Sequence, residues 1–326
     1  MITDRFNRIH NYLRISLTDN CDLRCFYCMP EADYVFTPPS RLMQPEEIES
    51  IAKIFVANGV TKIRLTGGEP LIRKDAADII LRLSALPVHL TLTTNGTRLH
   101  EVADVLEKAG VKSLNISLDT LNKERFKTMA RRDQFDRVFG NIQLMLKRGF
   151  HVKVNMVVVK GLNDAEIPDF IRWTKNEPVH VRFIEFMPFT GNRWERDKVF
   201  TWQQMLDTVS RDFDILPLEK EKNATAKKYL IPGHRGTFAV ISTMSAPFCG
   251  DCNRMRLTAD GKMKNCLFSN SETDLLTPFR NKSDILPLIQ ANILDKKKEL
   301  GGQFTTDLEK IHTDEIHNRS MIAIGG

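Results

Sequence analysis

Residues 13–28 read LRISLTDNCDLRCFYC, an alternation of apolar and polar residues that runs directly into three cysteines. The alternation over residues 13–18 is typical of a β-strand. Cys21, Cys25 and Cys28 follow at once, and in α/β barrels the active-site residues gather in the loops beyond the carboxyl ends of the strands. The stretch therefore predicts a barrel strand followed by a loop that carries chemistry.

The same order of strand, turn and helix repeats along the chain. Apolar residues recur at helical spacing between Ile48 and Val56, before the stop signal Asn58-Gly59, and again between Leu99 and Leu106, before Gly110. Five further strands are expected over 62–66, 89–93, 113–118, 152–159 and 179–186. Six βα units imply a parallel sheet.

One face of these strands is persistently polar. Because alternate residues share a face, the polar set comprises Arg14, Ser16, Thr18, Arg64, Thr66, Thr91, Thr93, Asn115, Ser117, Lys153 and Asn155. A sheet with one solvated side would show the same pattern. If the sheet curls with all its helices outside, however, the polar face lines a cavity, and we expect this arrangement. The predicted fold is α/β, an open six-stranded (βα)6 partial TIM barrel with a smaller C-terminal region closing the barrel mouth.

The alternation weakens from about Phe189 onward. Residues 219–228 are polar and charged, which indicates a linker or an exposed loop. A hairpin or small sheet is expected around residues 238–243 and a helix over 283–294. We therefore expect two domains, 1–190 with the partial barrel and 191–326 with the second group of cysteines.

Composition excludes several classes of protein. The 326 residues are 42% hydrophobic and 27% charged, which is usual for globular proteins, and no apolar run approaches the length of a membrane span. The first residues show no basic patch followed by an apolar segment, so we expect a cytoplasmic protein. With 47 basic and 41 acidic residues, the net charge of +6 is too small to indicate a nucleic-acid binder. It does permit an anionic ligand.

The six cysteines form two groups of three, because Cys249, Cys252 and Cys266 make a second triplet. Disulfides are not expected in a reducing compartment, and a local group of three cysteines cannot pair internally without leaving one thiol over, so metal sites are the natural alternative. Three thiolates suit a four-iron cluster in which one iron has no protein ligand. Structural zinc is the alternative, with a distant fourth ligand for the first triplet and His234 completing the second.

The spacing Cys21-x3-Cys25-x2-Cys28 after the first strand resembles the signature of the radical S-adenosylmethionine superfamily. Residues 66–70, TGGEP, resemble its glycine-rich element. The resemblance implies that the open iron of a [4Fe–4S] cluster chelates S-adenosylmethionine, and that one-electron reduction then yields a 5'-deoxyadenosyl radical. The residues implied to contact S-adenosylmethionine are Tyr27, Gly68, Ser117 and Met187.

The second triplet narrows the resemblance to the GTP 3',8-cyclase family, which begins molybdenum cofactor (molybdopterin) biosynthesis. The similar stretches span nearly the whole chain and include residues 12–19, 67–73, 93–96, 152–155 and 252–258 and the final Gly325-Gly326. The resemblance implies a second [4Fe–4S] cluster on Cys249, Cys252 and Cys266, whose open iron binds the guanine of GTP.

That family converts GTP to (8S)-3',8-cyclo-7,8-dihydroguanosine 5'-triphosphate by hydrogen abstraction from C3' and attack on C8. The residues implied to contact GTP are Arg14, Arg64, Thr93, Lys153, Arg254, Met255 and Arg256, with Arg14, Arg254 and Arg256 also catalytic. Gly325 and Gly326 are implied to enter the cavity, since residues without side chains can thread a narrow opening. A frayed chain end is the ordinary alternative.

Two residues depart from the family pattern: Asn7 stands where glycine is frequent, and Asp22 where asparagine is common. By analogy we expect a flavodoxin- or ferredoxin-like reductant and possible contact with the next pathway enzyme, cyclic pyranopterin monophosphate synthase. The chain is expected to be a monomer or homodimer that binds no nucleic acid and no membrane. The alternatives are a radical S-adenosylmethionine enzyme that modifies peptides, a zinc-dependent nucleic-acid binding module, and a related cyclase for another purine nucleotide.

Overall fold

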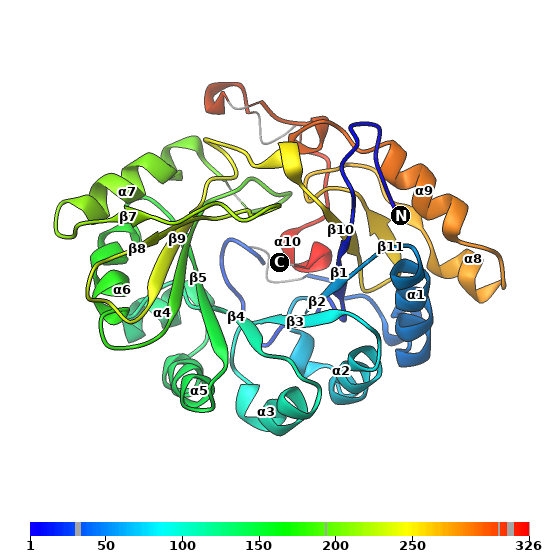
Figure 1. Cartoon of the computed structure of the whole chain (residues 1–326), viewed down its shortest axis with the longest axis horizontal. Coiled ribbons are helices and arrows are strands. Elements are labelled where there is room, and N and C mark those ends of the chain that lie inside the picture. The colour runs from blue at the N-terminus through cyan, green and yellow to red at the C-terminus, as the bar shows by residue number, and fades with distance from the viewer. Residues whose placement is uncertain (30–33, 193, 306, 312–315, 326) are drawn as a thin grey trace.

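The computed structural model describes residues 1–29, 34–192, 194–305, 307–311 and 316–325. Its centre is one curved sheet that forms an arc in Figure 1. The strands are β1 (Tyr12–Ser16), β2 (Lys62–Thr66), β3 (His89–Thr94), β4 (Ser113–Ser117), β5 (His151–Val158), β6 (His180–Glu185), β7 (Leu216–Pro217), β8 (Lys227–Leu230), β9 (Thr237–Ile241), β10 (Arg254–Leu257), β11 (Lys262–Lys264) and β12 (Thr273–Asp274).

The six expected strands are confirmed as β1 to β6, each with bounds within two residues of the prediction. They are parallel and lie side by side in chain order, so that Arg14 stands opposite Arg64 and Arg64 opposite Thr91. In-register parallel strands bring the polar residues of neighbouring strands next to each other on one face. The predicted partial barrel is therefore present, and it is open.

The C-terminal half extends this sheet at both edges. Strand β10 pairs in parallel with β1, and β9 pairs in parallel with β6, giving the order β12-β11-β10-β1-β2-β3-β4-β5-β6-β9-β8-β7. The hairpin expected around residues 238–243 exists as β8 and β9, but it belongs to the main sheet, where it pairs the edge of β6. The expected domain boundary near residue 190 thus divides a chain whose two parts share one sheet.

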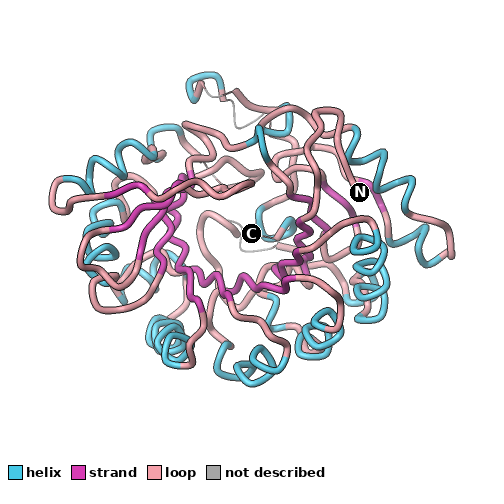
Figure 2. Tube along the Cα trace, viewed as in Figure 1, coloured by secondary structure: helices cyan, strands magenta, loops and turns pink. Residues whose placement is uncertain are grey.

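All of the helices except α10 lie outside the arc (Figures 1 and 2). The helices are α1 (Pro45–Ala57), α2 (Ala76–Ser84), α3 (Leu99–Lys108), α4 (Lys123–Ala130), α5 (Phe135–Lys147), α6 (Ile167–Trp173), α7 (Trp202–Ser210), α8 (Leu276–Arg280), α9 (Leu286–Leu294) and the short α10 (Met321–Ile324). In the part of the chain described, no helix combines the length and apolar character needed to cross a membrane.

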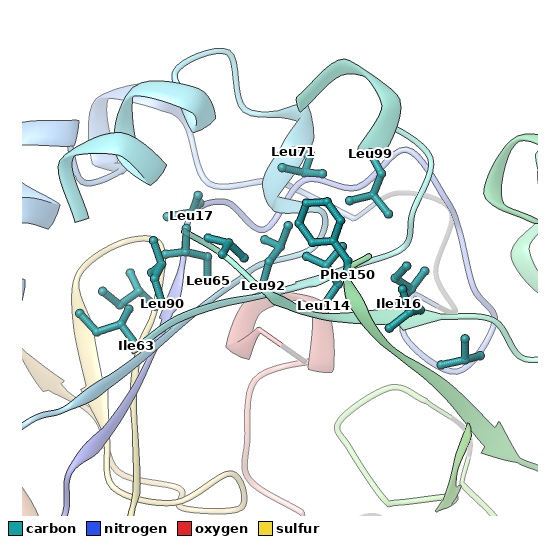
Figure 3. Close-up of a cluster of buried hydrophobic side chains, with 14 of the residues drawn as sticks. Leu17, Ile63, Leu65, Leu71, Leu90, Leu92, Leu99, Leu114, Ile116 and Phe150 are labelled. Carbon is teal, nitrogen blue, oxygen red and sulfur yellow. The ribbon is translucent and has the colours of Figure 1, made fainter. Parts of the chain in front are cut away.

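The hydrophobic core fills the space between the strands and the outer helices. Figure 3 shows this for β2, whose Ile63 and Leu65 point to the core with Leu114 and Ile116 of β4. These four side chains are at most 1% exposed. The residues between them, such as Arg64, must then face the inside of the arc. The alternation in the sequence therefore separates an apolar outer face from a polar inner one.

The polar inner face lines a cavity of about 470 Å³, as expected from the strand pattern. Its walls include Arg14, Arg64, Thr93, Asn115, Lys153, Asn155 and Arg182, all from strands β1 to β6. The C-terminal end of the chain, with α10, lies inside the arc in Figure 1.

Candidate active site

The first cysteine triplet lies in the loop that follows β1, and the glycine-rich turn after β2 holds this loop. Gly68 N–H donates to Thr18 O at 2.7 Å, and Glu69 N–H donates to Asn20 O at 2.8 Å. A Cβ at Gly68 would lie 2.5 Å from the Asp19 carbonyl oxygen. Glycine is therefore required here for the close approach of two loops of the chain itself, whether or not a ligand also approaches.

Glu69 ties the same turn to the end of β3. Its buried carboxylate accepts hydrogen bonds from Asn95 N–H at 2.6 Å, from the Thr94 hydroxyl at 2.8 Å and from Leu71 N–H at 3.0 Å. Burial raises the pKa of Glu69 to about 7, although these hydrogen bonds oppose the rise. The ends of β1, β2 and β3 are thus locked together around the first triplet.

The thiols of the first triplet are free and close enough to influence one another. Burial raises the pKa of Cys28 to about 12 and the pKa of Cys25 well above its ordinary value, and Asp119 adds to both shifts. Burial and Glu69 likewise raise the pKa of Cys21. A cluster of cationic iron ions is what would hold such thiols as thiolates. The donor set, three thiols on one loop, fits a [4Fe–4S] cluster with one open iron.

Tyr27 donates a hydrogen bond from its hydroxyl to Asp119 Oδ2 at 2.6 Å, and Val157 N–H donates to Asp119 Oδ1 at 2.9 Å. Burial raises the pKa of Asp119 to about 6. Asp119 follows β4, two residues after the predicted S-adenosylmethionine residue Ser117, and its carboxylate contacts a second one, Tyr27. Met187, a third, lines the cavity. Asp119 was missed from sequence because no pattern links it to Tyr27.

Asp22, one of the two departures from the family pattern, is also fixed by hydrogen bonds. It accepts from the side-chain amide of Asn95 and from the Thr97 hydroxyl, both at 2.7 Å. Its carboxylate adds to the rise in the pKa of Cys21. Asp22 therefore adds negative charge beside the first triplet and ties the triplet loop to the segment that follows β3.

Cations crowd the middle of the cavity. Arg64 donates to the Tyr12 hydroxyl at 2.5 Å and to Thr93 Oγ1 at 3.3 Å. Burial, then Arg182 and Arg64, lower the pKa of Lys153 to about 8. Burial and Arg64 also lower the pKa of Arg182 to about 9. Like charges held this closely favour a bound polyanion.

Arg182 was missed by the sequence analysis, although the signal was available. It lies on β6 opposite Asn155, whose Oδ1 it contacts through Nε at 2.8 Å. The alternation used for the first five strands places Arg182 on the same inner face. Extending the rule to the sixth strand finds it.

The second triplet lines the same cavity, together with Arg254 and Arg256 of β10. Burial lowers the pKa of Arg256 to about 10, and the nearby Cys266 opposes this change. The side chain of Met255 is 0% exposed and packs in the outer core, so the predicted contact of Met255 with GTP would have to be made by its main chain. Met255 alternates with its arginine neighbours, so only its main chain is left for a contact inside the cavity.

The C-terminal tail reaches this arginine pair. Arg256 Nη1–H donates a hydrogen bond to Gly325 O. Gly325 has φ +83°, and a Cβ there would lie 3.0 Å from Thr66 Cγ2 and 3.2 Å from Ser16 Cβ. Both the left-handed backbone and the close packing favour glycine. Gly326 lies outside the described residues.

A zinc ribbon completed by His234 does not form. His234 Nδ1 lies 2.8 Å from Thr174 Oγ1, and its ring packs edge-on against Phe213. Within the described ranges, no group of three or more His, Cys, Asp or Glu side chains is arranged around a single metal ion, so neither triplet has the arrangement of a zinc site.

Comparison with known families agrees with this geometry. Residues 15–174 match the Radical SAM superfamily, and residues 179–301 match Molybdenum Cofactor Synthesis C. A protein of Arabidopsis thaliana named GTP 3',8-cyclase, mitochondrial, is 44% identical over 100% of this chain and 84% of its own length. A Rhodopirellula baltica protein named GTP 3',8-cyclase is 42% identical over 100% of this chain and 92% of its own length. The chain belongs to the GTP 3',8-cyclase family.

Some relatives of this GTP 3',8-cyclase family chain are longer. Molybdenum cofactor biosynthesis protein 1 of Bos taurus is 45% identical over 99% of this chain but only 51% of its own length, so the chain spans about half of such relatives. Among solved structures, Streptococcus suis SuiB bound to S-adenosylmethionine has a TM-score of 0.64 at 16% identity, covering 97% of this chain and 78% of SuiB. That likeness concerns the fold alone.

Proposed function

We propose that the chain converts GTP to (8S)-3',8-cyclo-7,8-dihydroguanosine 5'-triphosphate, the first step of molybdenum cofactor biosynthesis. One observation carries the proposal: a single cavity is lined by the second cysteine triplet and by buried or half-buried cations from several strands, among them Arg14, Arg64, Lys153 and Arg182. A nucleoside triphosphate matches this combination, because its phosphates need cations and its base can reach a metal centre.

The residues fit the two cofactors of the family. Cys21, Cys25 and Cys28 would hold one [4Fe–4S] cluster and leave an iron for S-adenosylmethionine, with Tyr27, Gly68, Ser117 and Met187 around it. The remaining three cysteines would hold the second cluster. When bound, the first cluster and S-adenosylmethionine supply the organic radical that starts the reaction.

The protein's own side chains would bind and orient the nucleotide. Lys153, Arg64 and Arg182 would neutralise the triphosphate, and the hydroxyl of Thr93, which lines the cavity, would form a hydrogen bond with the nucleotide. Arg14, Arg254 and Arg256 would have the catalytic role, because Arg254 and Arg256 line the cavity with the second triplet and Arg14 stands opposite Arg256 on the neighbouring strand β1. Their positive charge favours binding of the nucleotide in one orientation.

The tail is part of this proposed site. Gly325 packs against Ser16 and Thr66. With Gly326 after it, the tail would shield the cavity from water while the reaction proceeds. For the wider setting, we propose a cytoplasmic enzyme, a monomer or homodimer. A flavodoxin- or ferredoxin-like protein would reduce it, and its product would pass to cyclic pyranopterin monophosphate synthase.

The deciding experiment is anaerobic nucleotide competition with the iron-reconstituted chain. We expect cyclised product from GTP, stoichiometric 5'-deoxyadenosine, and weaker competition by ATP than by guanine nucleotides. If another purine nucleotide competes more strongly than GTP and is itself converted, that nucleotide is the substrate and the proposal for GTP is wrong. Iron and labile sulfide analysis supplies a second check, because zinc without sulfide after anaerobic purification would contradict the proposal altogether.

A further inference from the structure

The first ten residues of the chain fold into a tight turn. Asn7 has φ +60°, a conformation that asparagine and glycine tolerate better than other residues, which explains the departure noted in the sequence. The fully buried Asp4 carboxylate closes the turn, since Oδ2 accepts from Arg8 Nε at 2.6 Å and Oδ1 accepts from Arg8 N–H at 3.0 Å. The turn thereby fixes the direction of the Arg8 guanidinium.

Arg8 joins this turn to the second cysteine triplet. Its Nη1 donates to Cys249 O at 2.8 Å and to Lys298 O at 2.7 Å, and its Nη2 donates to Lys297 O at 2.9 Å. Arg8 is 8% exposed, and these hydrogen bonds are charge-assisted. One guanidinium therefore connects the N-terminal turn, the Cys249 loop and residues 296–300.

Residues 296–300 in turn donate to two thiols of the triplet. Lys296 Nζ lies 3.7 Å from Cys252 Sγ and donates to Arg254 O at 3.0 Å. Leu300 N–H donates to Cys249 Sγ at 3.5 Å. Lys296 is only 2% exposed, so its ammonium acts on the sulfur with little screening by water.

The two triplets have opposite electrostatic surroundings. Beside the second triplet, Lys296 Nζ lies 3.7 Å and Arg254 Nη1 lies 3.9 Å from Cys252 Sγ. The first triplet instead lies among carboxylates, since Asp22 directly follows Cys21 and Asp119 accepts a hydrogen bond from Tyr27, the residue before Cys28. Cations therefore stabilise negative charge at the second triplet, whereas carboxylates destabilise it at the first.

Reduction adds one electron to an iron–sulfur cluster, and nearby cations or N–H···S hydrogen bonds stabilise the reduced form. We propose that Lys296, held by Arg8 and its turn, is a positioning residue that keeps the reduction potential of the second cluster above that of the first. The inference rests on the proposed function, because it requires a cluster on each triplet. At equilibrium the first electron then resides on the second cluster.

The test compares redox titrations, followed by electron paramagnetic resonance, of the reconstituted full chain. Lys296→Met removes the charge and keeps the length of the side chain. Lys297→Met is the matched control, because that neighbouring lysine is 54% exposed and pairs with Asp295. A full chain with Cys21, Cys25 and Cys28 replaced by Ala identifies the signal of the second cluster.

We expect Lys296→Met to shift the second cluster to a more negative midpoint potential and leave the first unchanged. Lys297→Met should shift neither, Lys296→Arg should restore the wild-type value, and Arg8→Met should shift the second cluster in the same direction as Lys296→Met. If Lys296→Met instead loses half of its iron while Lys296→Arg retains all of it, the need for the cation is also supported.

An unchanged midpoint potential and iron content in Lys296→Met would overturn the inference, as would a wild-type second cluster with the lower potential. Neither result would contradict the proposed GTP cyclisation if cyclised product still forms. A wild-type chain that takes up no cluster at the second triplet would overturn both.

Discussion

Arg256 on β10 donates a hydrogen bond to the carbonyl oxygen of Gly325, near the end of the chain. The pair lies on the inner face of the sheet, where Gly325 packs against Ser16 and Thr66. Arg256 is also one of the residues proposed to contact GTP. If Arg256 binds GTP as proposed, the tail and the nucleotide share one cation, and the tail belongs to the proposed site.

The tail can be tested with Gly325→Ala. We expect it to impair cyclisation several-fold while both clusters assemble and S-adenosylmethionine cleavage continues, because a Cβ meets Thr66 and φ is +83°. Gly149→Ala is the control, since Gly149 has φ +78° but a Cβ there meets nothing within 4 Å. The assay is cyclised product per 5'-deoxyadenosine. Deletion of Gly325 and Gly326, and extension of the chain beyond them, should lower this ratio as Gly325→Ala does. If the ratio is unchanged in the substitution, the deletion and the extension, the tail is an ordinary chain end.

The cysteine triplets should have separable effects. Ala at Cys21, Cys25 or Cys28 is expected to abolish S-adenosylmethionine cleavage, whereas Ala at Cys249, Cys252 or Cys266 should stop cyclisation and leave some uncoupled 5'-deoxyadenosine. Chromatography of both products from reconstituted variants measures this, with circular dichroism to confirm folding. Full cyclisation by a variant of the second triplet would contradict a two-cluster enzyme.

Loss of a cavity cation should weaken GTP binding about tenfold or more, since a buried charge-assisted hydrogen bond contributes roughly 1.5 to 3 kcal/mol. Arg14→Ala, Lys153→Ala and Arg256→Ala should each affect GTP more than S-adenosylmethionine, and GTP more than guanosine. Calorimetric titration measures the affinities. Arg148→Ala, at an arginine paired with Asp104 outside the cavity lining, is the control. Equal losses for guanosine and GTP would show that these residues do not contact the triphosphate.

GTP affinity should also depend on the protonation of Lys153. Burial, Arg182 and Arg64 lower the pKa of Lys153 to about 8, so the free site loses this charge as pH rises through 8. A bound triphosphate raises the pKa again, and binding above pH 8 therefore takes up a proton. Affinity should then fall as pH rises, by about tenfold per pH unit between the free and bound pKa values. Calorimetric titrations in buffers of different ionisation enthalpy measure the number of protons taken up on GTP binding, and Lys153→Met should abolish this uptake. Proton uptake that persists in this variant would show that another group takes up the proton.

Gly68→Ala should destabilise the fold by roughly 1 to 3 kcal/mol, because its Cβ overlaps the Asp19 carbonyl and forces two loops apart. Gly140→Ala, within α5, is the control, since a Cβ there meets nothing within 4 Å and alanine favours helix. Denaturant unfolding of the two cluster-free variants compares them. If Gly68→Ala has normal stability but binds S-adenosylmethionine more weakly, glycine is required for the close approach of the ligand and not for the packing of the two loops.

The candidate site could be predicted only in part. Arg14, Arg64, Thr93 and Lys153 follow from alternation along single strands, and the structure places all four on the cavity wall. Asp119, Glu69 and Lys296 could not be found this way, because their roles depend on contacts between segments far apart in the chain. Tyr27 and Asp119 are 92 residues apart, and Lys296 and Cys252 are 44 apart.

The sequence by itself determined the six central strands, the sidedness of the sheet and the two cysteine triplets. These features depend on local periodicity and spacing, which alternate backbone geometry converts directly into faces. Only the tertiary structure decided that β9 and β10 join opposite edges of one sheet, that Met255 faces away from the cavity, and that Arg8 supports the second triplet. Strand partners and buried charge networks are selected by the pairing of backbone and side-chain groups between distant segments, and no local pattern records that selection.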